Sequence, residues 1–218
     1  MTGDPRLLRF AELLLARNAT LNLTAARSPE AVAEHVRDSL AVAPFLREPF
    51  VDVGSGGGFP AIPLAIVTGF RGVLIESLAK KARFLEEAIA ALGLPLEVRA
   101  MRAEDAGRDP ALRERFASAT ARAVASLPAV LEFTVPLLAV GGVAVLQRGR
   151  LEERERSAAA DAALVLGAVL DGEHPAGTGP DDERRVVLAR KTLATGQRFP
   201  RRAGVPAKRP LCYELADA

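Results

Sequence analysis

A glycine-rich segment, VDVGSGGGFP at residues 51–60, carries the strongest chemical signature in the sequence. It predicts a strand that ends at Val53, a tight turn through glycines 54, 56, 57 and 58, and a helix opened by Pro60. Such a turn lets a ligand approach the backbone, and a helix N-terminus offers free N–H groups. Glu76 closes the next predicted strand, twenty residues after Gly56, where a carboxylate can accept both hydroxyls of a ribose. The spacing predicts a ribose-bearing cofactor.

The residues around the glycines bear on which cofactor this is. Counted from Gly54, the dinucleotide pattern GxGxxG fails because position 59 is Phe, but counted from Gly56 the variant GxGxxA is satisfied by Ala61. Asp52 argues against a dinucleotide, because a carboxylate so close to the first glycine would repel a pyrophosphate. The same carboxylate suits the ammonium of a methionine moiety. The segment therefore favours S-adenosylmethionine and a methyltransferase over a dinucleotide enzyme, and a glycine turn without a ligand is the third interpretation.

Residue types that are scarce in the sequence narrow the range of possible methyl acceptors. Methylation of C5 of a pyrimidine needs a cysteine nucleophile, and the one cysteine, Cys212, lies beyond the predicted sheet. Methylation of an exocyclic amine usually involves an Asn/Asp-Pro-Pro-aromatic turn after the fourth strand, where this chain has ARAVASLP. Guanine N7 carries no proton, so its methylation needs orientation and exclusion of water instead of a general base. The sequence is compatible with guanine N7, and equally with small-molecule or protein acceptors that need no acid–base pair.

Alternating strands and helices must position these residues. Two N-terminal helices are predicted, at 5–17 and from Ser28 to about Leu46, the second with Ser28 as its cap. From Phe50 the strands FVDV, GVLIE, LEVRA, ATARAV and GVAVLQ alternate with helical stretches, for example 80–92 and 127–139, which predicts a parallel sheet with helices on both faces. After a Gly/Pro/Asp-rich loop at 172–182, a strand at 185–191 is expected to return antiparallel.

The expected fold class is α/β, with a mostly parallel, Rossmann-like methyltransferase sheet, an antiparallel last strand and an N-terminal helical extension. We interpret the chain as one domain, 1–218, made of the helical extension 1–48, the cofactor-binding sheet 49–192 and a basic tail 193–218.

Composition excludes several other classes. The 218 residues are 49% hydrophobic and 26% charged, which is typical of a soluble globular chain. One cysteine and two histidines, His35 and His174, leave no basis for a disulfide or a metal site. The nearly uncharged stretch 123–147 is broken by glycines and prolines and does not predict a membrane span. We expect a cytoplasmic monomer without a metal.

The charge is unevenly distributed. Nine basic residues and no acidic one lie between Arg184 and Arg209, whereas the rest of the chain has 20 basic and 27 acidic residues. An acidic body with one basic edge is the pattern of a polyanion-binding surface, and a solvated strand and tail is an equal alternative. Gly204 and Pro206, flanked by PRR and KRP, predict an extended and poorly buried tail. Because the tail has few aromatic residues, it is expected to contact an RNA backbone without reading bases.

A second cluster lies on the second predicted helix. His35, Asp38 and Ser39 are spaced i, i+3 and i+4 and therefore share one face. Side chains that point the same way cannot form a catalytic relay, so either the face packs on the sheet edge, with His35 hydrogen-bonded to Asp38, or it faces RNA or orders a loop. Asn22 and Thr24, in LNLTA, are equally a capping turn or base contacts.

The motifs together resemble a known family. VDVGSGGGFPAIPLAI, preceded by NLTA and HVRDSL and followed by RAE (102–104), ARAVASL and FPRRAGVPAKRPL, is similar to the glucose-inhibited division protein B family, over residues 20 to 211. These are bacterial methyltransferases for guanine N7 in 16S ribosomal RNA. The resemblance implies their fold, S-adenosylmethionine as cofactor, and 16S ribosomal RNA or the small ribosomal subunit as partner. Arg148-Gly149 replaces the usual Lys-Gly, and ARNATLNLTA departs from the usual N-terminal turn.

The predicted site combines the residue-based and the family-based inferences. The resemblance places Gly54 and Phe59 in the cofactor loop, Ala103 and Glu104 near the adenine, and Arg122 beside the cofactor or the target base. The full cofactor-binding prediction is Asp52, Gly54, Gly56, Gly58, Phe59, Glu76, Ala103, Glu104 and Arg122. The RNA-binding prediction is His35, Asp38, Ser39, Arg148, Arg201, Arg202, Lys208 and Arg209. The rival hypotheses are a nicotinamide-dependent oxidoreductase and a non-catalytic RNA-binding assembly protein.

Overall fold

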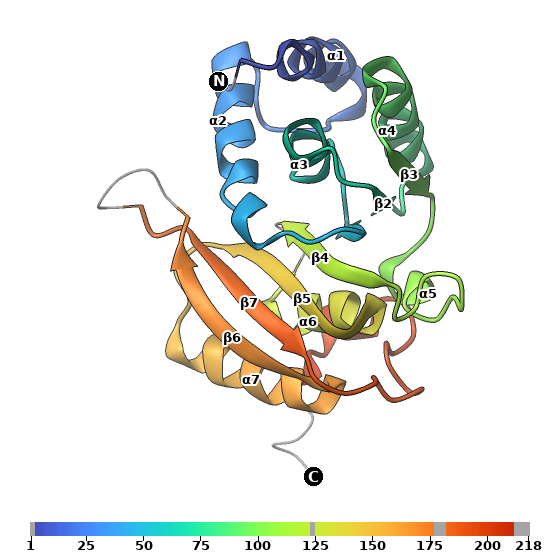
Figure 1. Ribbon diagram of the computed structural model, residues 1–218, viewed down its shortest axis with the longest axis vertical. Helices are drawn as coiled ribbons and strands as arrows, with labels where there is room; N and C mark the ends of the chain where they lie inside the picture. Colours follow the sequence, from blue (N-terminus) through green and yellow to red (C-terminus); the bar gives the residue numbers. More distant parts are fainter. Residues whose placement is uncertain (1–2, 123–124, 177–181, 212–218) are drawn as a thin grey trace.

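The computed structural model describes residues 3–122, 125–176 and 182–211, and its centre is a single seven-stranded sheet (Figure 1). The strand order is β3-β2-β1-β4-β5-β7-β6. Strands β1 to β5 pair in parallel, and β7 is antiparallel to both β5 and β6. The strands are β1 (Phe50–Val53), β2 (Gly72–Ile75), β3 (Leu96–Arg99), β4 (Phe116–Arg122), β5 (Leu138–Arg148), β6 (Ala168–Pro175) and β7 (Arg185–Lys191).

Helices cover both faces of this sheet (Figure 1). One layer holds α1 (Pro5–Leu21), α2 (Pro29–Leu40), α3 (Ala61–Thr68) and α4 (Ala79–Leu92), with a 3-10 turn at Ala43–Phe45. The other layer holds α5 (Ala103–Ala106), α6 (Leu127–Thr134) and α7 (Glu153–Leu166), with a 3-10 turn at Val135–Leu137 and the short α8 (Val205–Lys208) against α6. The predicted α/β class and antiparallel last strand are confirmed.

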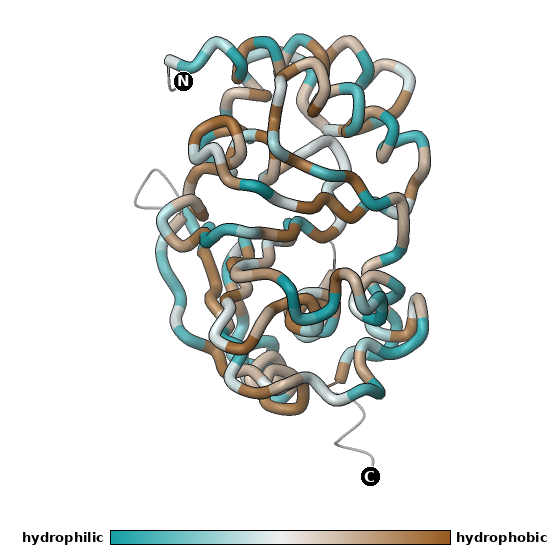
Figure 2. Tube along the Cα trace, turned by 45° about the vertical axis from the view of Figure 1, so that its right-hand side comes forward, coloured by the Kyte–Doolittle hydropathy of each residue, from teal (hydrophilic) through white to brown (hydrophobic). Residues whose placement is uncertain are grey.

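Side chains that alternate along the strands contribute to two hydrophobic cores, one on each face of the sheet. In β1, Phe50 is buried against the α1–α4 layer, whereas Val51 and Val53 are buried in the core under α6 and α7. Successive side chains of a strand point to opposite faces, so a strand buried on both sides reads as a continuous apolar run. Figure 2 shows brown segments in the middle of the molecule, and brown and teal alternating along the outer helices. The extension α1–α2 thus completes one helical layer, and the strands of the described residues lie between Phe50 and Lys191.

Local sequence signals explain how the extension reaches the glycine-rich segment. Asp4 and Ser28 cap α1 and α2 with their side-chain oxygens. Asn18, buried at the end of α1, accepts from the N–H groups of Leu23 and Thr24 through its Oδ1 and donates to two carbonyl oxygens further along the turn. Asn22 ends α1 with φ +50°, and the Thr24 hydroxyl accepts from the N–H of Ala26. In this structure Asn22 and Thr24 serve as turn residues.

Two predicted helices are shorter than expected, and prolines explain both. The second helix was predicted to reach about Leu46 and ends at Leu40. A proline ring clashes with the carbonyl four residues before it, and Pro44 stands four residues after Leu40. The helix predicted at 127–139 ends at Thr134, since Pro136 has no N–H to continue it, and β5 begins at Leu138.

The loop predicted at 172–182 is partly wrong as well. Its first residues belong to β6, an edge strand that runs to Pro175 and pairs with β7 alone. The register shifts between Leu170 and Gly172, and Gly172 has φ +124°. Glycine tolerates this conformation and often marks a bulge in a strand, so the composition that suggests a loop also fits an irregular edge.

The basic tail is packed onto the body of the molecule, which corrects the expectation of an extended, poorly buried segment. Phe199 and Leu211 are buried in the core under α6 and α7. The guanidinium of Arg201 pairs with the fully buried carboxylate of Glu132 in α6, at 2.7 Å. Cys212, expected in this tail, lies outside the described residues. Within the described part of the chain, no helix has the length and apolar character needed to cross a membrane.

Candidate cofactor and substrate site

The glycine loop lies at the carboxyl ends of β1 and β2, where the strand order reverses between β1 and β4. Gly54, Gly56 and Gly58 have φ values of +74°, +53° and +94°, a region that residues with a Cβ rarely adopt. A Cβ on Gly58 would stand 2.6 Å from the side chain of Ile62, and one on Gly57 would stand 2.9 Å from the carbonyl oxygen of Leu23. The turn therefore requires glycine both for its conformation and for its packing against the extension.

Glu76 holds this loop in place. Its buried carboxylate accepts hydrogen bonds from the N–H of Gly56, at 2.9 Å, and from the N–H of Leu78, at 2.8 Å. Each carboxylate oxygen has a second lone pair, so Glu76 can still accept from two further donors. Ribose hydroxyls are such donors. The predicted position of Glu76 beside the loop fits a ribose, and the structure adds that the same carboxylate joins the ends of β1 and β2.

Asp52 offers a buried carboxylate on the other side of the loop. It is 1% exposed, and the Thr120 hydroxyl donates to its Oδ1 at 2.8 Å. Its Oδ2 is buried and, within the described residues, has no hydrogen-bond donor. Burial raises the pKa of Asp52 to about 7, although hydrogen bonds from Ser55 and Thr120 and the charge of Arg122 act in the opposite direction. A buried carboxylate with an oxygen left over fits the ammonium group that the sequence suggests.

A cavity of about 210 Å³ opens beside the loop. Gly54, Ala103 and Glu104 line it, as the family resemblance implies for the adenine. Gly204 and Ala207 of the tail also line it, and the Gly204 N–H donates to Glu104 Oε1 at 2.7 Å. The tail therefore forms a wall of this pocket, although it is far from the glycine loop along the chain.

Phe59 connects the glycine loop to a second cavity through its contact with Arg122. Its ring lies 5.2 Å from the ring of Phe10 and 5.4 Å from that of His35, measured between centroids. The guanidinium of Arg122 lies 5.0 Å from the Phe59 centroid, a cation–π distance. Burial lowers the pKa of both Arg122 and His35. Arg122 also lines a cavity of about 230 Å³, which we call the arginine pocket because four of the eight described residues that line it are arginines (Asp38, Arg122, Gln147, Arg148, Gly149, Ala176, Arg184 and Arg185).

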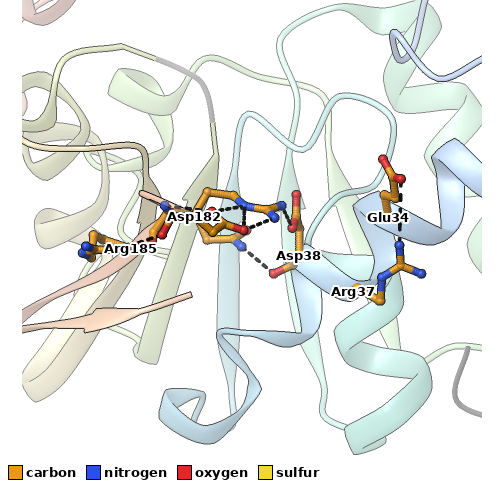
Figure 3. A network of polar contacts seen from close by, with 7 residues as sticks. Glu34, Arg37, Asp38, Asp182 and Arg185 are labelled. Atoms are coloured by element: carbon orange, nitrogen blue, oxygen red, sulfur yellow. Dashed lines mark hydrogen bonds and ion pairs between the residues drawn. The ribbon is translucent and has the colours of Figure 1, made fainter. Parts of the chain in front are cut away.

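The structure separates the residues that the sequence grouped on α2. Ser39 is fully buried and donates its hydroxyl hydrogen to the carbonyl of His35 at 2.7 Å, so its predicted RNA contact is wrong. Asp38 forms an ion pair with Arg184 at the start of β7, not the expected hydrogen bond with His35 (Figure 3). His35 instead packs its ring on Phe59. Of the three, Asp38 faces the arginine pocket.

The other residues predicted to bind RNA, Arg148 of β5 and the basic residues of the tail, differ in how accessible their side chains are. Arg201 cannot serve as one, because its guanidinium is held by Glu132 and its side chain is only 15% exposed. Arg148 donates to the carbonyl of Ala125 and to Glu155, so it is a fixed wall of the arginine pocket. The side chains of Arg202, Lys208 and Arg209 are exposed and stay candidates for RNA contacts.

Sequence reasoning missed the part that Gln147 and Arg184 play. Gln147 is the last predicted residue of a strand, and only the register of β4 with β5 places it opposite Arg122. Arg184 belongs to the basic run, but nothing in the sequence indicates that it pairs with Asp38, 146 residues earlier. The basic run was the one sequence signal for this region, and it does not show that Arg184 pairs with Asp38 of α2.

Comparison with known proteins agrees with this geometry. The O-methyltransferase from Bacillus cereus, solved in complex with SAH, superposes with a TM-score of 0.60 at 20% identity, covering 84% of this chain and 91% of that one. Cofactor-bound Rv0187 from MTB superposes with a TM-score of 0.59 at 20% identity, covering 90% and 93%. The fold, the glycine loop and its two carboxylates define an S-adenosylmethionine-dependent methyltransferase.

Sequence comparison identifies the family. The model of the GidB family, described as rRNA small subunit methyltransferase G, matches residues 4–177. The proteins called ribosomal RNA small subunit methyltransferase G from Rubrobacter xylanophilus and Pelotomaculum thermopropionicum are 47% and 42% identical to this chain, covering 94% and 93% of it and 83% and 88% of their own lengths. The chain belongs to this family. The resemblance, the enzyme class and the cofactor predicted from the sequence are confirmed, and the oxidoreductase and the non-catalytic protein are set aside.

Replacing Glu76 by Ala is expected to weaken cofactor binding about 10- to 100-fold, since hydrogen bonds to a charged partner contribute roughly 1.5–3 kcal/mol. The loss should be similar for S-adenosylmethionine and S-adenosylhomocysteine, because both contain the ribose. Isothermal titration calorimetry with each ligand measures it, and Glu97→Ala, at an exposed position of β3, is the matched control. A variant that discriminates strongly between the two ligands would instead place Glu76 beside the methyl group.

Proposed function

We propose that this protein transfers the methyl group of S-adenosylmethionine to N7 of a guanine in the 16S ribosomal RNA of the small subunit. We propose further that it acts as a cytoplasmic monomer. Membership of a family described as rRNA small subunit methyltransferase G supports the RNA substrate. The absence of a cysteine and of an Asn/Asp-Pro-Pro-aromatic turn in the sequence around the pocket supports N7 over pyrimidine C5 or an exocyclic amine.

The observation that carries the proposal is the contact of Arg122 with Phe59, which links a pocket lined by four arginines to the glycine loop. One cavity meets the glycine loop and Glu104, and the other is lined by Arg122, Arg148, Arg184 and Arg185. Guanidinium groups suit phosphate and nucleic acid because they are planar, permanently charged donors. A cofactor site that adjoins a positively charged pocket is the arrangement that methyl transfer to RNA requires.

The chemistry at N7 asks the protein mainly for position. When bound, S-adenosylmethionine supplies an electrophilic methyl group on its sulfonium. Asp52 and Glu76 offer carboxylate oxygens for the ammonium and the ribose, and Glu104 lines the cavity beside the glycine loop. Phe59 is buried and Arg122 lies over its ring, so the two side chains shield this part of the glycine loop from water. Because N7 has a free lone pair and no proton, none of these residues needs to act as a general base.

The direct test is to incubate the purified protein with S-adenosylmethionine and either naked 16S ribosomal RNA or small subunits. The RNA is then digested to nucleosides for mass spectrometry and mapped by cleavage at 7-methylguanine. We expect 7-methylguanosine at one position in at least one of the two substrates. A methyl group on another atom, or on no RNA nucleotide, would contradict the proposal.

The exposed basic residues of the tail should contribute affinity without choosing the base. Replacement of Arg202, Lys208 and Arg209 by Ala is expected to lower the slope of log affinity against log salt by about 0.7 per lost phosphate contact, or roughly 2 in all. The methylated position should not change. Filter binding across a salt series measures the slope, and Arg9, Arg17 and Arg83, on the helical layer across the sheet from α8, form a triple-Ala control with an unchanged slope. An unaltered slope in the tail variant would mean that these three side chains make no phosphate contacts.

A further inference from the structure

We propose that the arginine pocket holds the target guanine by its Watson–Crick edge, with the Asp38 carboxylate accepting hydrogen bonds from N1–H and the 2-amino group. This inference rests on the proposed function and names the residue that selects the base. Asp38 would then be the specificity-determining residue of the reaction.

The position of the pocket supports this assignment. Arg122 belongs to its lining and at the same time lies over the Phe59 ring in the glycine loop. A base in the pocket would therefore be separated from the cofactor loop by no more than the Phe59–Arg122 pair. The other cavity is lined by Gly54 and by Ala103 and Glu104, the two residues expected near the adenine.

The charge arrangement singles out Asp38. Among the described residues that line the pocket it is the one carboxylate, and four of the others are arginines. Two contacts hold Asp38 at the pocket: its carboxylate pairs with Arg184, and its backbone carbonyl accepts from Gln147 Nε2 (Figure 3). Arg184 also pairs with Asp182. In Figure 3 the contacts of Asp38 and Asp182 form one continuous network across the gap between α2 and the β7 side. The Asp38 side chain is nevertheless 19% exposed, so it is reachable from the pocket.

Gln147 adds a second acceptor at the same wall. Its Nε2 is committed to the carbonyl of Asp38, and this bond sets which way the amide faces. Its Oε1 is buried and, in the part of the chain that the structure describes, has no donor. A buried acceptor without a donor is costly unless something completes it. The pocket wall thus combines a carboxylate with an amide oxygen that lacks a partner.

Base chemistry matches this wall to guanine. Guanine presents two adjacent donors, N1–H and the 2-amino group, which one carboxylate can accept together. Adenine presents an acceptor at N1, which a carboxylate repels. N7 lies on the opposite side of the purine from the 2-amino group, so a guanine held by Asp38 through its donor edge leaves N7 free for methylation. Enzymes that modify a base commonly read it in this way, by hydrogen bonds to the Watson–Crick edge.

The test replaces one guanine by inosine, which keeps N7 and N1–H and lacks only the 2-amino group. A 16S ribosomal RNA assembled by splinted ligation carries inosine at the nucleotide that the wild-type protein methylates. We expect kcat/KM for methyl transfer, and RNA affinity measured with S-adenosylhomocysteine present, to fall about 10- to 100-fold for the inosine RNA with the wild-type protein. In Asp38→Asn this difference should shrink to a few-fold.

Arg184→Met is the matched control, because it breaks the same ion pair and leaves the Asp38 carboxylate in place. It should bind both RNAs more weakly and keep the full guanine-over-inosine ratio. If Asp38 serves only to hold Arg184, the two variants will change the ratio equally, which overturns the assignment. A wild-type protein that methylates guanine and inosine equally well also overturns it while the proposed function stands, whereas the absence of any 7-methylguanine overturns both.

Discussion

Arg201→Ala is expected to lower the free energy of unfolding by about 3–5 kcal/mol, because it would leave a buried carboxylate without its counter-charge. Glu132 is 0% exposed, and three of the hydrogen bonds to its carboxylate come from the Arg201 guanidinium, at 2.7 to 3.1 Å, with a fourth from the Arg201 backbone N–H at 2.7 Å. Urea denaturation followed by circular dichroism measures the loss. Affinity for S-adenosylmethionine should fall too, since the segment that Arg201 anchors supplies Gly204 and Ala207 to the pocket.

Two further variants distinguish the loss of the ion pair from a general destabilisation of the tail. Arg202→Ala, at the exposed neighbouring position, should change stability by no more than about 0.5 kcal/mol. The double variant Arg201→Met with Glu132→Leu replaces both charges by apolar groups, which often costs little or stabilises, and should recover most of the loss. A single Arg201→Ala variant as stable as the wild type would contradict the buried pair.

Asp52→Asn is expected to remove a pH dependence of stability and to weaken cofactor binding. Because the folded-state pKa is about 7 and the unfolded value about 3.9, the folded protein holds this proton more tightly than the unfolded chain between those values. The contribution of Asp52 to stability therefore falls as the pH rises from about 4 to about 7, by up to about 4 kcal/mol. The charge of Glu76 raises this pKa and that of Arg122 lowers it.

The comparison needs unfolding curves at pH 5 and pH 8 without cofactor. Asp52→Asn should lose less stability between these values than the wild type and be the more stable protein at pH 8. Its affinity for S-adenosylmethionine at pH 8 should nevertheless be about 10- to 100-fold lower, because the ionised carboxylate for the ammonium is gone. Asp161→Asn, at an exposed position of α7, is the control. Equal pH dependence in the two proteins would mean that Asp52 is ionised across this range.

The cofactor half of the site could be read from the sequence because its signals are local. Gly54, Gly56 and Gly58 adopt positive φ angles that only a glycine turn supplies cheaply, and Glu76 follows at the end of the adjacent strand. The alternation of strands and helices likewise predicts the parallel sheet, since each element carries its own periodicity. The family motifs added Phe59 and Arg122, whose contact the sequence alone does not reveal.

The substrate half could not be read in the same way, because it depends on pairs between distant residues. On a helix wheel, His35, Asp38 and Ser39 are equivalent, yet Ser39 is buried, His35 packs on an aromatic ring and Asp38 pairs with an arginine just before β7. The tail shows the same limit. Counting charges cannot distinguish Arg201, which neutralises a buried carboxylate, from its exposed neighbour Arg202.

The return of the tail to Glu104 also bears on the order in which the site is completed during translation. The hydrogen bond from Gly204 to Glu104 joins residues 100 positions apart, and the wall that it closes is missing until residues 199–209 have left the ribosome. The glycine loop and the first five strands are therefore synthesised before the residues that complete the cofactor pocket. A chain that stops before residue 199 lacks both the wall supplied by Gly204 and Ala207 and the counter-charge of Glu132, so the binding of the methyl donor depends on the last segment to be made.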